Sequence, residues 1–256
     1  MLNESKNAQF VLIGENHNTK EIPEFTSALF ELLHNHYQFE YLALEQDPAM
    51  MRIVSDRNTN IQDLARKYPY GFTFITDQEL ALIEKARSIS KAKNPIWGCD
   101  QSFGASHSLD IINNFLDSKT KNQIIADSLY KDIYKKEMTR NLETYHYMAE
   151  LNKREQLLTI KNNIPSKYTK RLAFYIDELL ISDTIYNLIK TKKYFESRSM
   201  REEYMKIRFL NEYKLAFVKN ELPKVVLKFG NNHLNNGYNP GSNVNSLGNF
   251  VRQLSF

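Results

Sequence analysis

The stretch "VLIGENH", residues 11–17, is an apolar run that ends at a glycine and then presents a carboxylate and an imidazole. Near the other end of the chain, "VVLKFGNNH", residues 225–233, repeats this pattern with a second Gly-x-x-His. Short apolar runs without polar alternation are typical of strands that are covered on both faces. The two stretches therefore predict central parallel strands that end in similar turns.

Two further runs of strand length, 41–44 and 95–97, lie between them, and segments with helical periodicity alternate with the strands. The first helix is expected to begin at a cap formed by Asn18 with Glu21, and the second at a Thr76 to Glu79 capping box. On the first helix, periodicity predicts one buried face, which consists of Phe25, Leu29, Leu32, Leu33 and His36.

From about Ser106 to Asn220 the sequence turns to amphipathic helix, and strand character returns only afterwards. The predicted fold class is α/β, with a mostly parallel central sheet flanked by helices. A helical insertion over 106–220 is expected before the last strand, within a single domain over 1–256.

Composition excludes several classes of protein. A chain of 256 residues with 42% hydrophobic content can bury a full core. The net charge of +4 is small, and positively and negatively charged residues are mixed along the chain, so nucleic acid is not an expected partner. The lone Cys99 excludes an internal disulfide. No signal peptide and no apolar run of about 18 residues is found, so no membrane span is expected. The expected location is the cytoplasm, or outside it if a signal peptide was removed.

Polar side chains follow all the predicted strands at the point where each strand ends. Parallel strands deliver their carboxyl ends to one edge of a sheet, where ligands of α/β proteins bind. We therefore expect His17, Glu45 and His233 to face one small-molecule substrate there. Asp100 follows the third strand and is expected at the same edge, with a cap on the helix after it as the alternative role. The sequence does not predict the oligomeric state.

These motifs resemble the superfamily of erythromycin esterases, ChaN-like haem-associated lipoproteins and TIKI-type proteases, and the erythromycin esterase-like branch most of all. "LALEQDP" (42–48) looks like that branch's second strand with its acidic residue, and "NPIWGCDQSF" (94–103) looks like its Gly-x-Asp-x-Gln strand end. "RSMREEYMKIRFLNEY" (198–213) is similar to its Arg-rich helix, and "GNNHLNNG" (230–237) to its closing His strand. The aromatic loop at 68–74 lacks the usual Trp, and "GENHN" has the tighter spacing of the ChaN-like and TIKI-type members.

The resemblance implies a hydrolase that attacks a carboxylic ester, a lactone included, in a cleft at the carboxyl ends of the strands. His17 is the preferred general base, because an imidazole accepts a proton near neutrality. Glu15 and Glu45 would orient it or hold the water. His233 would serve as second base or donate to the leaving group or oxyanion, and Asp100 would support the site. Arg201, or Arg198 in its place, would stabilise negative charge. The expected substrate-binding residues are Tyr70, Phe72, Phe74, Asp47, Gln101 and Asn232.

Three alternatives remain open at this point. Two histidines and a carboxylate are a common divalent-metal set, so a metal-dependent hydrolase would use the same residues, although the esterases imply that no cofactor is required. A ChaN-like protein would instead bind haem or another hydrophobic ligand. The chain is also consistent with one domain of a larger toxin or effector.

Overall fold

The computed structural model of the chain describes residues 2–123, 126–139, 154–217, 222–239 and 241–255. Four parallel strands form its central sheet. Their spatial order is β1 (Phe10–Glu15), β4 (Val225–Gly230), β2 (Tyr41–Leu44) and β3 (Ile96–Gly98). A small antiparallel pair follows, made of β5 (Tyr238–Asn239) and β6 (Val244–Asn245). The predicted strands and the α/β fold class are confirmed.

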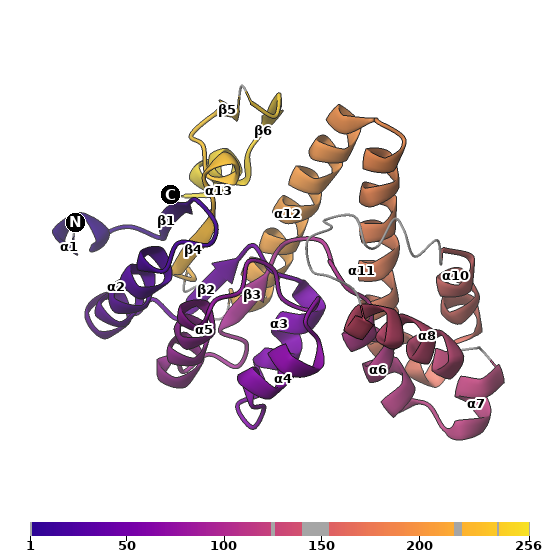
Figure 1. Cartoon of the computed structure of the whole chain (residues 1–256). Coiled ribbons are helices and arrows are strands. Elements are labelled where there is room, and N and C mark those ends of the chain that lie inside the picture. Colours follow the sequence, from indigo (N-terminus) through magenta and orange to yellow (C-terminus); the bar gives the residue numbers. More distant parts are fainter. Residues whose placement is uncertain (1, 124–125, 140–153, 218–221, 240, 256) are drawn as a thin grey trace.

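Helices flank the sheet and fill the long interval before its last strand (Figure 1). Those that precede β3 are α1 (Leu2–Ser5), α2 (Glu21–Tyr37), α3 (Pro48–Val54), α4 (Ile61–Lys67) and α5 (Asp77–Ile89). Those between β3 and β4 are α6 (Ser106–Phe115), α7 (Ser118–Gln123), α8 (Ala126–Thr139), α10 (Arg154–Asn163), α11 (Ser166–Lys190) and α12 (Tyr194–Ala216). Those after β4 are the 3-10 turn η1 (Asn231–His233) and α13 (Leu247–Leu254). Parts of the predicted insertion, at 124–125, 140–153 and 218–220, lie outside the described residues.

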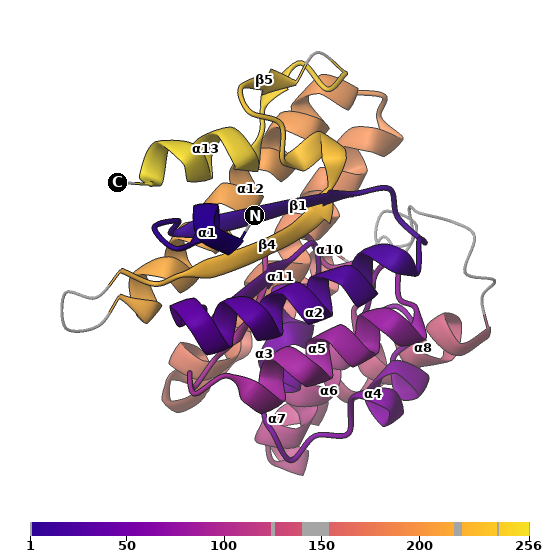
Figure 2. The same cartoon turned by 90° about the vertical axis from the view of Figure 1, so that its left-hand side faces the viewer.

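Three hydrophobic clusters hold these layers together. One lies between a face of the sheet and α2 to α5, with Phe30 and Ile83 among its fully buried side chains. The second covers the opposite face, where Trp97 and Phe209 pack with α12 and α13. The third joins α6, α8, α10 and α11. Figure 2 shows α2 and α5 side by side, with α13 on the other side of β1 and β4. The strands β4, β2 and β3 are therefore covered on both faces, whereas β1 is an edge strand on which Leu12 is 37% exposed.

The buried face of α2 differs from the one predicted. Leu29 and Leu33 are buried as expected, but Phe25 and Leu32 are 45% and 41% exposed, and His36 is exposed. Phe30 takes their place in the core with no exposed surface. The helix carries two overlapping apolar stripes with the same period, and only contact with the sheet selects between them.

The two predicted helix starts have different outcomes. At α5, the Thr76 hydroxyl accepts a hydrogen bond from Glu79 N–H at 3.2 Å, which is one half of the predicted capping box. The Glu79 carboxylate, which would complete the box, instead accepts from Lys228 Nζ. At α2, Asn18 does not cap the helix: it has a left-handed φ of 66°, and the cap residue is Lys20 without a side-chain bond. The start of α2 is therefore not set by a side-chain cap.

Among the described residues, no helix combines the length and the apolar character that a membrane crossing requires.

Gly98 provides a test of how closely β3 packs on the start of α3. A Cβ at this position would lie 2.5 Å from the Asp47 carbonyl oxygen and 2.7 Å from Pro48 Cα, and backbone atoms cannot move aside easily. We expect Gly98→Ala to lower the free energy of unfolding by about 1–3 kcal/mol, the usual cost of overpacking. Urea denaturation measures this change. Gly241→Ala is the control, because its Cβ would meet only the Asn239 side chain, at 3.3 Å. Equal stability of the two variants would contradict the packing argument.

Candidate active site

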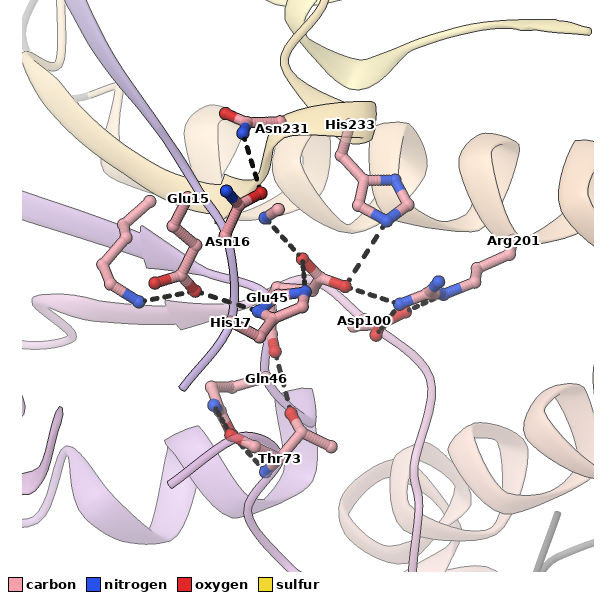
Figure 3. A network of polar contacts seen from close by, with 12 residues as sticks. Glu15, Asn16, His17, Glu45, Gln46, Thr73, Asp100, Arg201, Asn231 and His233 are labelled. Carbon is pink, nitrogen blue, oxygen red and sulfur yellow. Dashed lines mark hydrogen bonds and ion pairs between the residues drawn. The ribbon is translucent and has the colours of Figure 1, made fainter. Parts of the chain in front are cut away.

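The two Gly-x-x-His turns lie side by side because β1 and β4 are paired in parallel. The register places Glu15 opposite Gly230, so both strands end at the same level. β2 pairs with the other side of β4 and is followed directly by Glu45. Figure 3 shows Glu45 between His17 and His233, with Arg201 beside them. Residues from positions 15 to 233 thus meet at one edge of the sheet.

Glu45 is the centre of this network. Its Oε2 accepts a hydrogen bond from Gly230 N–H at 2.8 Å and lies 3.7 Å from His17 Nε2. Its Oε1 lies 2.7 Å from Arg201 Nη2 and 3.4 Å from His233 Nε2. Burial alone would raise the pKa of Glu45, but the hydrogen bond with His233 and the nearby positive charges hold that pKa well below its usual range. Glu45 is therefore an ionised carboxylate shared by the two imidazoles.

His17 is the more accessible imidazole, with 25% of its side chain exposed. Its Nδ1 lies 3.1 Å from Glu15 Oε1. Burial would raise the pKa of Glu15, but its bonds with His17 and Lys228 lower it overall, so Glu15 is ionised and Nδ1–H donates to it. The Phe74 ring stacks on the imidazole with centroids 3.7 Å apart. This arrangement leaves Nε2 as the nitrogen with a free lone pair.

His233 is more enclosed, and its two nitrogens face two carboxylates. Nδ1–H donates to Glu202 Oε1, while Glu202 Oε2 accepts from Leu247 N–H at 3.0 Å, which fixes the carboxylate. Burial alone would lower the pKa of His233, but its hydrogen bonds to Glu202 and Glu45 raise it to about 9. At neutral pH the site therefore holds an imidazolium at this position.

Arg201 is fixed by Asp100. The guanidinium Nε donates to Asp100 Oδ1 at 2.9 Å and Nη2 donates to Oδ2 at 2.6 Å, a bidentate pair. Asp100 has no exposed surface and caps no helix, since α6 begins only at Ser106. Arg198, the competing residue, instead contacts the Gly241 carbonyl at 3.4 Å. The helix geometry thus brings Arg201, and not Arg198, to Glu45.

The residues expected to contact substrate lie in different surroundings. Phe74 covers His17, whereas Tyr70 and Phe72 are 6% and 5% exposed and belong to two hydrophobic clusters. Phe74 itself has a left-handed φ of 49°, an uncommon conformation for an aromatic residue. Only Phe74, of these three aromatic residues, lies against a catalytic candidate.

The polar residues expected to contact substrate also lie in different surroundings. Asp47 accepts hydrogen bonds from the backbone at the start of α3 and pairs with His107 at 3.0 Å, with 2% of its surface exposed. Gln101 is buried at 3% exposure. Asn232 is exposed, and its carbonyl accepts from Asn239 Nδ2 at 2.7 Å. Capping of α3 and the pair with His107 together account for the burial of Asp47.

Two charged residues of the site were not predicted. Glu202 follows Arg201 directly, and Lys228 lies inside the quoted run "VVLKFG". A lysine within an otherwise apolar central strand is the signal that could have identified Lys228. Nothing in the sequence distinguishes Glu202 from its neighbour Glu203.

The surroundings of Glu45 bear on whether this site suits a divalent metal. Among the residues that the structure describes, no group of three His, Cys, Asp or Glu side chains is arranged to hold a metal ion. Arg201 places a positive charge 2.7 Å from Glu45 Oε1, and Gly230 N–H occupies the other oxygen. A cation beside Glu45 would be repelled by this guanidinium.

Comparison with solved structures decides the fold. The match to a succinoglycan biosynthesis protein covers 99% of this chain and 65% of the length of that protein, with a TM-score of 0.61 at 17% sequence identity. A protein from Bacillus cereus matches 98% of this chain and 64% of its own, with a TM-score of 0.60 at 17% identity. A histidine-to-asparagine mutant of an erythromycin esterase, in its open conformation, matches 97% of this chain and 67% of its own, with a TM-score of 0.58 at 15% identity. The chain has the erythromycin esterase fold.

The chain spans slightly less than two thirds of the length of the first two proteins. No family model matches the sequence, and none of the curated proteins matches it. At 15–17% identity the likeness to erythromycin esterase concerns the fold, so activity has to be argued from the site.

The imidazolium at His233 leads to a prediction. We expect its ring protons to titrate by NMR with a midpoint near pH 9, because Glu202 and Glu45 favour the charged form. Since this pKa is raised above the ordinary value of about 6.5, the stability it contributes is complete below about pH 6.5 and is lost as the pH rises through the folded-state value. Glu202→Gln should lower the midpoint. Glu203→Gln, at an exposed neighbouring position, should not. A His233 midpoint near 6.5 in the unmodified protein would contradict the assignment.

Proposed function

We propose that this chain is a hydrolase that cleaves a carboxylic ester, a lactone included, with a water molecule activated by His17 and without a metal ion. The observation that carries the proposal is the convergence of a Glu15-oriented His17, an ionised Glu45 and a protonated His233 beside Arg201. The fold shared with an erythromycin esterase supports it.

His17 suits the role of general base. Glu15 holds Nδ1–H, so Nε2 can take a proton from water near neutral pH. The hydroxide oxygen then bonds to the ester carbonyl carbon, and the carbonyl electrons move onto its oxygen. Glu45 Oε2 lies 3.7 Å from Nε2 and stabilises the imidazolium that forms. The pairing resembles the logic of other His–carboxylate bases.

His233 and Arg201 suit the opposite role. Both carry positive charge at neutral pH and both contact Glu45, so they suit the stabilisation of an oxyanion and a leaving alkoxide. When the tetrahedral intermediate collapses, the bond from carbon to the alkoxide breaks and His233 donates a proton to that oxygen. The products are one acid and one alcohol. The two imidazoles then return to their starting states by exchanging the transferred proton through solvent.

An apolar wall beside His17 favours a substrate with a hydrophobic acyl or ring portion. The Phe74 ring meets Phe103 edge-on at 6.3 Å, and Phe103 meets Tyr186 at 6.1 Å. These residues come from the loop before α5, the loop after β3 and α11. Uncharged carbon surface packs well on such rings.

A panel of p-nitrophenyl esters and lactones tests the proposal. With any substrate that is turned over, we expect His17→Asn and His233→Asn each to lower kcat by about 10²–10⁴-fold, the usual range for general acid and base groups. Glu45→Gln should lower it as well, because both imidazoles lose their shared carboxylate. His36→Asn, at an exposed position on α2, is the matched control.

Loss of turnover in only one of the two histidine variants would show that the pairing is wrong. Absence of hydrolysis across the panel, with the folded state confirmed, would count against the esterase proposal as a whole.

Metal removal tests the mechanism independently. We expect dialysis against EDTA to leave the rate of ester hydrolysis unchanged, because Arg201 already supplies the positive charge beside Glu45. Elemental analysis of protein purified without chelator checks the same point. A stoichiometric metal ion that is lost in His17→Ala would contradict the metal-free mechanism and favour the metal-dependent alternative.

A further inference from the structure

Lys228 is a charged side chain in the middle of the sheet. It belongs to β4, the strand between β1 and β2, and its register neighbours are Ile13 and Leu44. Only 3% of its surface is exposed. An ammonium in such apolar surroundings is costly unless it is paired. A function or a strong structural need must therefore account for it.

Two carboxylates from different elements of the chain hold this ammonium. Nζ lies 2.8 Å from Glu15 Oε1 on β1 and 2.9 Å from Glu79 Oε1 on α5. Glu79 is also buried, with 3% of its surface exposed. One carboxylate would suffice to neutralise one lysine. Burial raises the pKa of Glu79, while Lys228 acts to lower it. When Glu79 is ionised, the group of Glu15, Lys228 and Glu79 has an excess of negative charge next to His17.

The same oxygen of Glu15 faces both Lys228 and His17. Glu15 Oε1 accepts from His17 Nδ1 at 3.1 Å while it contacts Nζ at 2.8 Å. The contacts thus form a continuous line that runs Glu79, Lys228, Glu15, His17, in which the first three side chains are buried and His17 is partly exposed. The last member of this line is the proposed general base, so the inference rests on the proposed function.

We propose that Lys228, held in place by Glu79, is a positioning residue that sets the proton affinity and orientation of His17 through Glu15. The ammonium keeps Glu15 ionised, so that its oxygen accepts from Nδ1–H and leaves Nε2 free. It also offsets part of the negative charge that Glu15 presents, so that His17 remains neutral enough to act as a base. Glu79 opposes this effect, because its negative charge offsets part of the positive charge of the same ammonium. The proton affinity of His17 is therefore set by the balance of two carboxylates on one lysine.

Other charges also face His17 and stay constant in the test. Glu45 contacts it directly at 3.7 Å, and His233 and Arg201 reach it through Glu45. Phe74 covers one face of the ring without charge. A change at Lys228 or Glu79 alters none of these contacts directly.

NMR titration of the His17 ring tests the proposal without any substrate. Lys228→Met removes the cation from Glu15, so we expect the His17 midpoint to move to higher pH, by about one unit for a charge lost at this range. Glu79→Gln keeps an oxygen acceptor for Nζ but removes the competing charge, so the midpoint should move to lower pH. Loss of a cation and loss of a carboxylate that both act on the ring must shift its midpoint in opposite directions. An ion pair that only holds α5 on the sheet, without acting on the charge of the ring, would shift neither midpoint. Lys85→Met, which breaks an exposed pair with Glu31 on the same α5, should leave the midpoint unchanged.

Opposite shifts in the two variants support the proposal, and the acid limb of the pH profile of ester hydrolysis should move with them. Unchanged midpoints, or shifts of one sign, in folded variants overturn it. If Lys228→Met does not fold, Glu79→Gln decides alone, and an unchanged or raised midpoint overturns the proposal. Opposite shifts without ester hydrolysis would reject the esterase proposal and keep the positioning role. Ester hydrolysis without shifts of the His17 midpoint would keep the esterase proposal and reject the positioning role of Lys228.

Discussion

Parallel pairing of β1 with β4 is the constraint on which the site depends. It brings Glu15 level with Gly230, and the two turns that follow then fit into each other. A Cβ at Gly14 would lie 2.3 Å from Asn231 Oδ1, and a Cβ at Gly230 would lie 2.8 Å from His17 Nε2. Each glycine therefore makes room for a side chain of the other turn, which explains why both apolar runs end in Gly-x-x-His.

Opposite charges alternate along this edge of the sheet, and this alternation lowers the free-energy cost of burying them. Each buried carboxylate of the site faces a cation or an imidazole, and Glu45 faces three such groups. Buried charges are costly when a partner is missing, so the members of the network hold one another in place. The same low-dielectric surroundings make each charge effective in chemistry. Substitutions within the network should for this reason be far from additive.

Helix α12 connects the helical part of the chain to the chemistry. Consecutive residues, Arg201 and Glu202, reach different partners: Arg201 contacts Asp100 and Glu45, and Glu202 contacts His233. Further along the same helix, Phe209 packs against Trp97 in the core of the sheet. The apolar contacts position the helix, and the two charged residues depend on that position. The helices before β4 thus supply charged residues of the candidate site as well as apolar packing around it.

The sequence by itself determined the strands, the start of α5 at Thr76 and the strand ends that carry Glu45 and Asp100, because apolar runs and capping motifs are local signals. Only the tertiary structure decided which face of α2 is buried and that Arg201, not Arg198, reaches Glu45. It also decided that Lys228 joins Glu15 to Glu79. Helical periodicity fixes the spacing of residues along a helix but not its rotation about its axis, and ion pairs between distant residues exist only once packing has set that rotation.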